Sequence, residues 1–127
     1  MKNKTGFLFL FIVIFFASIF IYVQKSHRNI NAEMPEFSIT SKLLLNEFFI
    51  NEIEASSKFL DKTILVNGQV TEINGNFLTL DDKIYCKFDT IISKSILNTN
   101  LKIKGRCIGY DDLLEQIKID QCIIELK

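Results

Sequence analysis

The sequence predicts a small, mainly β barrel that follows an N-terminal transmembrane helix. Gly6–Val23 is an uncharged apolar run, and at the helical rise it spans about 27 Å, close to the thickness of a bilayer's hydrocarbon core. The rest of the chain contains short segments that alternate apolar and polar side chains, as half-buried β-strands do. The pairs Asn74-Gly75 and Asp81-Asp82 mark tight turns between the first of these segments.

The first 28 residues form the expected membrane anchor. A cleaved signal peptide has a shorter apolar region that is followed by small residues. In this chain Ala17 and Ser18 lie inside the apolar run. An uncleaved anchor through residues 6–23 is therefore the favoured prediction, and a cleaved signal is the alternative.

Basic residues flank the apolar run on both sides. Lys2, Lys4 and the α-amino group precede it, and Lys25 and Arg28 follow it. The positive-inside rule then favours a cytoplasmic N-terminus. We expect a single-pass membrane protein with residues 29–127 on the extracytoplasmic side. If the anchor is cleaved, the protein is secreted or periplasmic.

Charge is unevenly distributed along the chain. The chain has 15 basic and 15 acidic residues, and residues 1–28 hold four of the basic ones and none of the acidic ones. Residues 29–127 therefore carry 11 basic and 15 acidic residues, a net charge of −4. Because nucleic-acid binding draws on neutralisation of phosphates, this composition argues against a nucleic-acid partner.

A linker and a helix are expected before the strands. Residues 29–37 are polar and include Pro35, which disfavours helix in the preceding residue. The domain then covers 38–127 and begins with one amphipathic helix over Ser38–Phe59, capped by Ser41. The expected buried side of this helix comprises Leu45, Phe48, Phe49 and Ile53.

Five strands follow the helix in this prediction. Their expected bounds are Thr63–Ile73, Phe77–Leu80, Lys83–Phe88, Leu101–Gly109 and Glu115–Leu126. Residues 89–98 have isoleucines at helical spacing and predict a short helix between strands three and four. A three-strand meander, a helix and a closing hairpin are the order of a five-stranded OB-type Greek-key barrel.

Several short motifs occur in a characteristic order. KFLDKTILVNGQV and IYCKF are followed by LKIKGRCIGY and IKIDQCII, after the helix residues Asn51, Ala55 and Phe59. Over residues 45–126 this pattern resembles the tRNA anticodon-like family of exported bacterial proteins. The resemblance implies an OB fold, export and, with the anchor, a place in the bacterial inner membrane, and it implies no settled activity. One departure lies at residues 59–62, where Phe-Leu-Asp-Lys replaces the usual aromatic-glycine-lysine step.

The three cysteines have two interpretations. All of Cys86, Cys107 and Cys122 fit as small core residues. If the last two strands pair about a centre between residues 114 and 115, Cys107 and Cys122 face each other. An oxidising compartment would then favour a disulfide between them and leave Cys86 as a buried thiol.

No catalytic, cofactor or metal site is expected. The sole histidine, His27, lies beside the membrane segment, and the chain has no Cys-x-x-Cys pair. Ser-His or Cys-His nucleophiles and zinc sites therefore lack their usual residues. The pairs Asp81-Asp82 and Asp111-Asp112 fall at turns, where solvated aspartates are common. We expect a protein that is not an enzyme.

A ligand face is the remaining candidate, because OB barrels bind ligands across strands two and three. Its outward side chains would be Phe77, Thr79, Lys83, Tyr85 and Lys87, which suit base stacking and phosphate contact. The plain polar side of an amphipathic strand gives the same pattern. A second basic stripe on strand four comprises Lys102, Lys104 and Arg106.

Two functional hypotheses follow. The favoured one is a non-catalytic, membrane-tethered OB module on the extracytoplasmic side that binds or scaffolds an envelope protein. The alternative is a single-stranded nucleic-acid-binding OB domain that uses the outward face of strands two and three.

Overall fold

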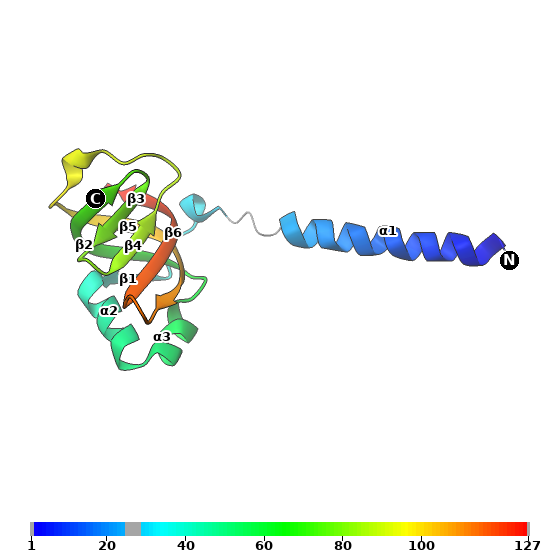
Figure 1. The fold of residues 1–127 in the computed structure, drawn as a ribbon, viewed down its shortest axis with the longest axis horizontal. Coiled ribbons are helices and arrows are strands. Elements are labelled where there is room, and N and C mark those ends of the chain that lie inside the picture. The colour runs from blue at the N-terminus through cyan, green and yellow to red at the C-terminus, as the bar shows by residue number, and fades with distance from the viewer. Residues whose placement is uncertain (1, 25–28, 127) are drawn as a thin grey trace.

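The computed structural model describes residues 2–24 and 29–126, and it contains an N-terminal helix and a closed β-barrel (Figure 1). The N-terminal part comprises α1 (Lys2–Gln24), the 3-10 turn η1 (Ile30–Ala32), β1 (Phe37–Thr40), α2 (Ser41–Ile50) and α3 (Glu52–Phe59). The barrel strands are β2 (Thr63–Asn74), β3 (Phe77–Leu80), β4 (Ile84–Lys87), β5 (Asn100–Asp111) and β6 (Gln116–Glu125). A second 3-10 turn, η2 (Lys94–Ile96), lies between β4 and β5.

The five barrel strands close in the OB order, as the sequence predicts. The order is β2-β3-β4-β6-β5, and an antiparallel β2–β5 pairing closes the barrel. β4 and β6 pair in parallel, and the other four barrel pairings are antiparallel. The interior is filled by inward side chains that are fully buried, among them Ile64, Val66, Leu78, Ile103 and Ile117.

Strand β2 carries the bulge that its sequence indicates. The register with β3 shifts between Val70 and Glu72, so that Thr71 is the extra residue. The alternation of apolar residues slips at the same point. A bulge here bends β2, which lets one long strand pair with β3 at one end and with β5 at the other.

The single helix expected over residues 38–59 is wrong in two respects. Residues 37–40 form β1, which pairs in parallel with β2. The helical part is broken at Asn51, whose side chain accepts a hydrogen bond from the Glu54 N–H (3.1 Å) and so begins α3. The expected cap Ser41 is also wrong, because Thr40 caps α2 and accepts from the Leu43 N–H.

The helix break also corrects the expected buried side. Phe48 is buried as expected and Leu45 is partly buried, but Phe49 is 79% exposed and Ile53 is 84% exposed. The side chains that the helices bury are Leu44, Phe48, Ala55 and Phe59. Because α3 starts a new helix at the break, the periodicity of a single continuous helix does not apply across it.

The turn between α3 and β2 forms without the glycine that the related pattern has there. Asp61 has a φ of 62°, in the left-handed region that glycine adopts without strain. Aspartate is among the few other residues that visit this region. The aspartate therefore takes the conformation for which the related pattern uses glycine, and the chain enters β2 without interruption.

Part of the segment expected as a linker packs on the barrel. Ile30 is 1% exposed. The Lys104 ammonium, on β5, donates hydrogen bonds to the backbone carbonyls of Asn31 (3.1 Å) and Glu33 (3.0 Å). We call Ile30, Asn31, Glu33 and Lys104 the N-terminal clamp. It fixes the chain against the barrel shortly after the end of α1.

The helix α1 is apolar over its whole length. Residues Asn3–Val23 have a mean hydropathy of 2.8, and the barrel buries none of this stretch. Length and composition alone qualify it to cross a membrane or to act as a signal sequence.

The short helix expected over residues 89–98 is reduced to the 3-10 turn η2.

Candidate binding surfaces

The expected ligand face is brought together in part. Phe77 on β3 and Tyr85 on β4 stack on each other, with ring centroids 4.8 Å apart and an interplanar angle of 23°. Lys87 is exposed and lies opposite Phe77 in the β3–β4 register. These three side chains form an outward aromatic and basic group, in which each ring already uses one face for the other.

Thr79 and Lys83 do not extend this group. Thr79 is only 6% exposed. Lys83 lies in the β3–β4 turn, where its ammonium donates to the Leu114 carbonyl (3.5 Å) and pairs with Glu115 (3.6 Å). OB ligands are also held by the loops after strands one and four of the barrel. Here these loops are short and comprise residues 75–76 and 112–115. They extend little beyond the strands, so the face is shallow.

The second basic stripe on β5 is mostly engaged in internal contacts. Lys104 is 7% exposed and belongs to the N-terminal clamp. Arg106 forms a two-point ion pair with Asp120 on β6, at 3.0 and 2.7 Å. Of the three residues, Lys102 is the exposed one. The stripe therefore stabilises the barrel and its N-terminal segment more than it offers a surface for an anion.

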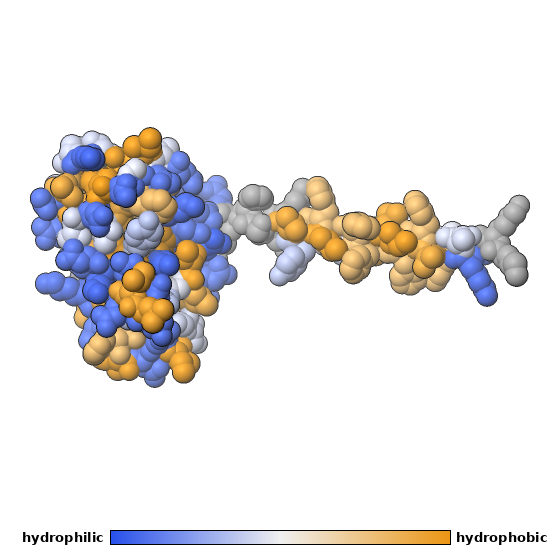
Figure 2. Space-filling view, in the orientation of Figure 1, coloured by the Kyte–Doolittle hydropathy of each residue, from blue (hydrophilic) through white to orange (hydrophobic). Residues whose placement is uncertain are grey.

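A different surface is apolar and exposed. It lies where the α2–α3 corner and the β5–β6 loop meet near Tyr110, and Figure 2 shows hydrophobic side chains at the end of the barrel that carries the helices. We call it the end surface. It comprises Phe49 (79% exposed), Ile50 (73%), Ile53 (84%), Leu113 (90%) and Leu114 (57%).

Tyr110 lies between α2 and the β5–β6 loop, beside the end surface. Tyr110 stacks on Phe48 of α2, with ring centroids 5.3 Å apart. A hollow of about 350 Å³ is lined by Phe49, Tyr110 and Glu115, together with Leu45, Asn46, Lys42 and Lys83. Burial of its ring and nearby carboxylates, Glu115 and Glu52 first, raise the pKa of Tyr110. The hollow therefore combines apolar and aromatic side chains with charged groups of both signs.

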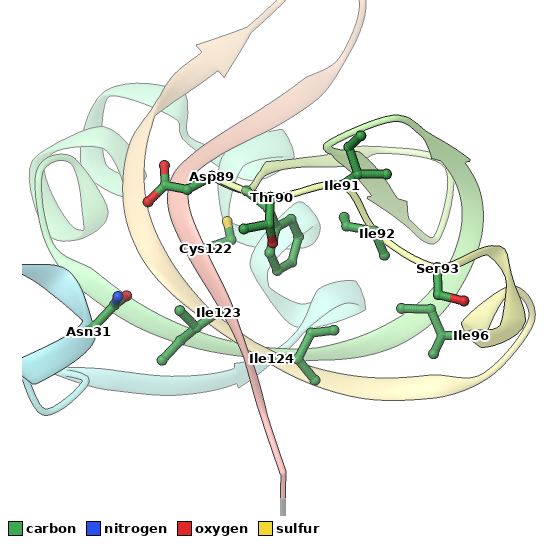
Figure 3. Close-up of a pocket in the computed structure, with 11 residues that line it drawn as sticks. Asn31, Asp89, Thr90, Ile91, Ile92, Ser93, Ile96, Cys122, Ile123 and Ile124 are labelled. Carbon is green, nitrogen blue, oxygen red and sulfur yellow. The ribbon is translucent and has the colours of Figure 1, made fainter.

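A second hollow lies beside the N-terminal clamp. It has a volume of about 490 Å³ and is bounded by the connection after β4, by the end of β6 and by Asn31 (Figure 3). Ile92 and Ile96 face it from the connection, and Ile123 and Ile124 from β6. Asn31, Asp89, Thr90 and Ser93 also line it, so its walls are partly apolar and partly polar.

The cysteines do not adopt the pairing expected from the strands. In the β5–β6 register Cys107 lies opposite Ile119. The hairpin starts with Asp111 opposite Gln116, so its centre lies one residue earlier than expected, and an irregularity between Cys107 and Gly109 shifts the pairing by one further residue. The expected register, with Cys107 opposite Cys122, is wrong. All three cysteines are buried and unbridged in the structure. The neighbouring thiol of Cys122 is that of Cys86.

Cys107 gives the barrel a specific dependence on alkaline pH. Burial raises the pKa of its thiol from 9.0 to about 11. The unfolded chain loses this proton more readily, so the contribution is fully present below pH 9 and is lost as pH rises through 11. Urea unfolding of the wild type should lose about 2–3 kcal/mol more than Cys107→Ala between pH 8 and pH 11. Parallel pH curves for the two proteins would contradict this.

The described residues also bear on catalysis. Within residues 2–24 and 29–126, no group of three or more His, Cys, Asp or Glu side chains is placed to hold a metal ion. The aspartate pair 81–82 lies at the β3–β4 turn, where Asp81 accepts a hydrogen bond from Ser41. The Asp81 carboxylate thus links the turn to the start of α2, and the Asp82 backbone N–H donates to the Thr71 hydroxyl.

Comparison with known proteins gives a family and a fold. The family model described as tRNA_anti-like matches residues 1–118. A crystal structure from Klebsiella pneumoniae, of a "putative nucleic acid-binding lipoprotein", superposes with a TM-score of 0.53 at 17% identity. The match covers 69% of this chain and 90% of that one, and it supports the fold alone. No curated protein matches the chain. The barrel order, the motifs and the family match agree, and the chain belongs to the tRNA_anti-like family.

Proposed function

We propose that this protein is a membrane-tethered, non-catalytic OB module that binds another protein of the cell envelope on the extracytoplasmic side. The end surface is the observation that carries the proposal. Its five large apolar side chains are exposed by more than half, although a barrel of this size has little apolar surface to spare. Contiguous exposed apolar side chains are typical of protein interaction sites.

The N-terminal clamp supports the tethered arrangement. A membrane-spanning α1 would hold the barrel within a few residues of the bilayer, because Ile30 and Lys104 fix the following segment. An envelope protein bound at the end surface would then be held close to the membrane. The absence of histidine from residues 29–127 supports a non-catalytic role.

Membrane topology is tested with two substitutions that each add one cysteine, one in the barrel domain and one near the start of α1. Because the three native cysteines are buried, they provide a low background for labelling. Leu113→Cys, at a position 90% exposed, should react with a membrane-impermeant maleimide in intact spheroplasts. Asn3→Cys should react only after permeabilisation. The barrel should also stay with membranes after a carbonate wash. Labelling of Leu113→Cys only after permeabilisation, or release by carbonate, would overturn the proposal.

Partner binding is tested by photo-crosslinking in cells. A photoreactive residue at position 113 should give one discrete adduct with an envelope protein. The matched control is the same residue at Lys94, which is also exposed but lies on η2, outside the end surface. Phe49→Ser should abolish the adduct from position 113. Equal adducts from positions 94 and 113, or adducts unaffected by Phe49→Ser, would contradict a specific site.

A second candidate function is binding of single-stranded nucleic acid. The stacked pair Phe77–Tyr85 beside Lys87 favours it, as does the similarity in fold to the Klebsiella protein described as a "putative nucleic acid-binding lipoprotein". Labelled oligonucleotides should then bind the full chain in detergent at low salt. Tyr85→Ala and Lys87→Glu should weaken binding, while the control Lys94→Glu should not. No binding at low salt removes this candidate.

A further inference from the structure

Two buried thiols lie at the contact between the parallel strands β4 and β6. Cys86 on β4 is in register with Ile119 on β6. The Cys122 thiol donates a hydrogen bond to the carbonyl oxygen of Ile119, at 3.5 Å. The sulfur of Cys122 is therefore placed beside the β6 residue that pairs with Cys86. Cys86 is fully buried and Cys122 is 5% exposed.

The chain conformation brings Cys122 inward at this point. Gln121 has a φ of 49°, which interrupts the alternation of β6, so that both Ile119 and Cys122 are buried. On the neighbouring strand, Gly105 leaves room for the sulfur, since a Cβ there would lie 2.9 Å from Cys122 Sγ. The Cys86 thiol is the neighbouring thiol that acts on that of Cys122 and raises its pKa. Cys107, on β5, pairs with the other side of Ile119, and the groups that act on its thiol are Gly109 and Asp120.

We infer that Cys86 and Cys122 are the pair that forms a disulfide when the domain reaches an oxidising compartment, and that Cys107 stays a free thiol. This rests on the extracytoplasmic location of the proposed function. The two thiols lose two protons and two electrons to form one S–S bond. A disulfide-bearing carrier protein of that compartment accepts them and is reduced to two thiols. Secreted small domains commonly use such bridges.

The bridge would join β4 to β6, the one parallel contact in the barrel wall. It closes a loop that includes β5 and the long connection containing η2, so it restricts the unfolded chain substantially. Burial raises the pKa of the Cys122 thiol, and the neighbouring Cys86 thiol raises it further. Since the thiolate is the reactive form, we expect the bond to form before the barrel closes.

Tryptic digestion separates the three cysteines into different peptides. Cys86 falls in residues 84–87, Cys107 in 107–118 and Cys122 in 119–127. The full chain, denatured directly from membranes in N-ethylmaleimide, should give the 84–87 peptide linked to 119–127. Cys107 should carry the maleimide. The purified chain, unfolded and refolded in detergent with oxidised glutathione, should give the same linked pair whatever its cellular location.

Single-cysteine variants distinguish this pair from the other two. Cys107→Ala should keep the bridge, and a reductant should lower its unfolding midpoint by roughly 10 °C or more, as in the wild type. Cys86→Ala should leave Cys122 alkylated and its midpoint insensitive to reductant. Any linked peptide that contains Cys107, or three alkylated thiols after oxidative refolding, would overturn the inference. Failure of the Leu113→Cys labelling would overturn the proposed location instead.

Discussion

Phe59→Ala should lower the free energy of unfolding of the barrel domain by about 3–5 kcal/mol. Phe59 is fully buried and holds the helices on the barrel. Its ring centroid lies 5.1 Å from that of Phe37 on β1 and 6.0 Å from that of Phe48 on α2. Truncation removes both contacts and leaves a cavity between three elements. Urea unfolding of the full chain in detergent, followed by circular dichroism, measures the loss.

The same helical unit supplies a matched control. Phe49→Ala removes the same number of atoms from a side chain that is 79% exposed. Its expected change is within about 0.5 kcal/mol, because surface substitutions seldom alter stability more. Equal losses for the two variants would show that the helices are not held by Phe59. A small loss for both would mean that they contribute little to the stability of the domain.

Gly105→Ala should cost about 3 kcal/mol or more, at the upper end of the range for overpacked interiors. The new Cβ would lie 2.5 Å from Ile119 Cγ2 and 2.9 Å from both the Asp120 carbonyl oxygen and Cys122 Sγ. One of these neighbours is backbone in the adjacent strand, so the clash cannot be relieved by side-chain rotation alone. β5 and β6 would have to separate, and the unfolding midpoint should fall accordingly.

Gly75→Ala is the control for this substitution. Gly75, in the β2–β3 turn, has a φ of 64°, and a Cβ added there would have no atom within 4 Å. Its replacement is expected to cost about 1 kcal/mol, from backbone strain without a clash. A Gly105→Ala variant no less stable than Gly75→Ala would contradict the close approach of β5 and β6.

The strands were predictable because each one carries its own signal. Alternation in β3 and β4 and the Asn74-Gly75 turn are local, and the observed bounds of these strands fall within a residue of the predicted ones. The β5–β6 register is different, because it depends on the centre of the turn and on an irregularity between Cys107 and Gly109, and alternation encodes neither. A shift of this kind changes which cysteines can meet, although the strands themselves are predicted well.

The break between α2 and α3 has a local sequence signal, which the helical spacing of the apolar residues obscures. Asn51 followed three residues later by Glu54 is the pattern of a helix N-terminus. The apolar spacing of Phe49 and Ile53 fits a continuous helix, and it outweighed that signal. The end surface could not be predicted for this reason, since Phe49 and Ile53 were assigned to the core. Their exposure follows from the new start of the helix at residue 52.

The sequence of β5 alone could not predict the burial of Lys104 either. Alternation places it on the polar side of β5, and that side is covered by residues 30–33, which are distant in sequence. Two backbone carbonyls satisfy its ammonium there. A lysine on the polar face of a strand is therefore expected to be exposed to solvent only where no other segment of the chain covers that face.

The N-terminal clamp and β1 also determine how the domain would respond to a mechanical load. Tension that reaches the barrel through α1 acts first on Ile30 and on the two hydrogen bonds of Lys104. Beyond them it reaches β1, which runs parallel to β2 over four residue pairs. Pulling on the start of β1 while the far end of β2 is held would load those hydrogen bonds together, in shear. The attachment would then yield as a unit, and the barrel would be protected from unzipping strand by strand.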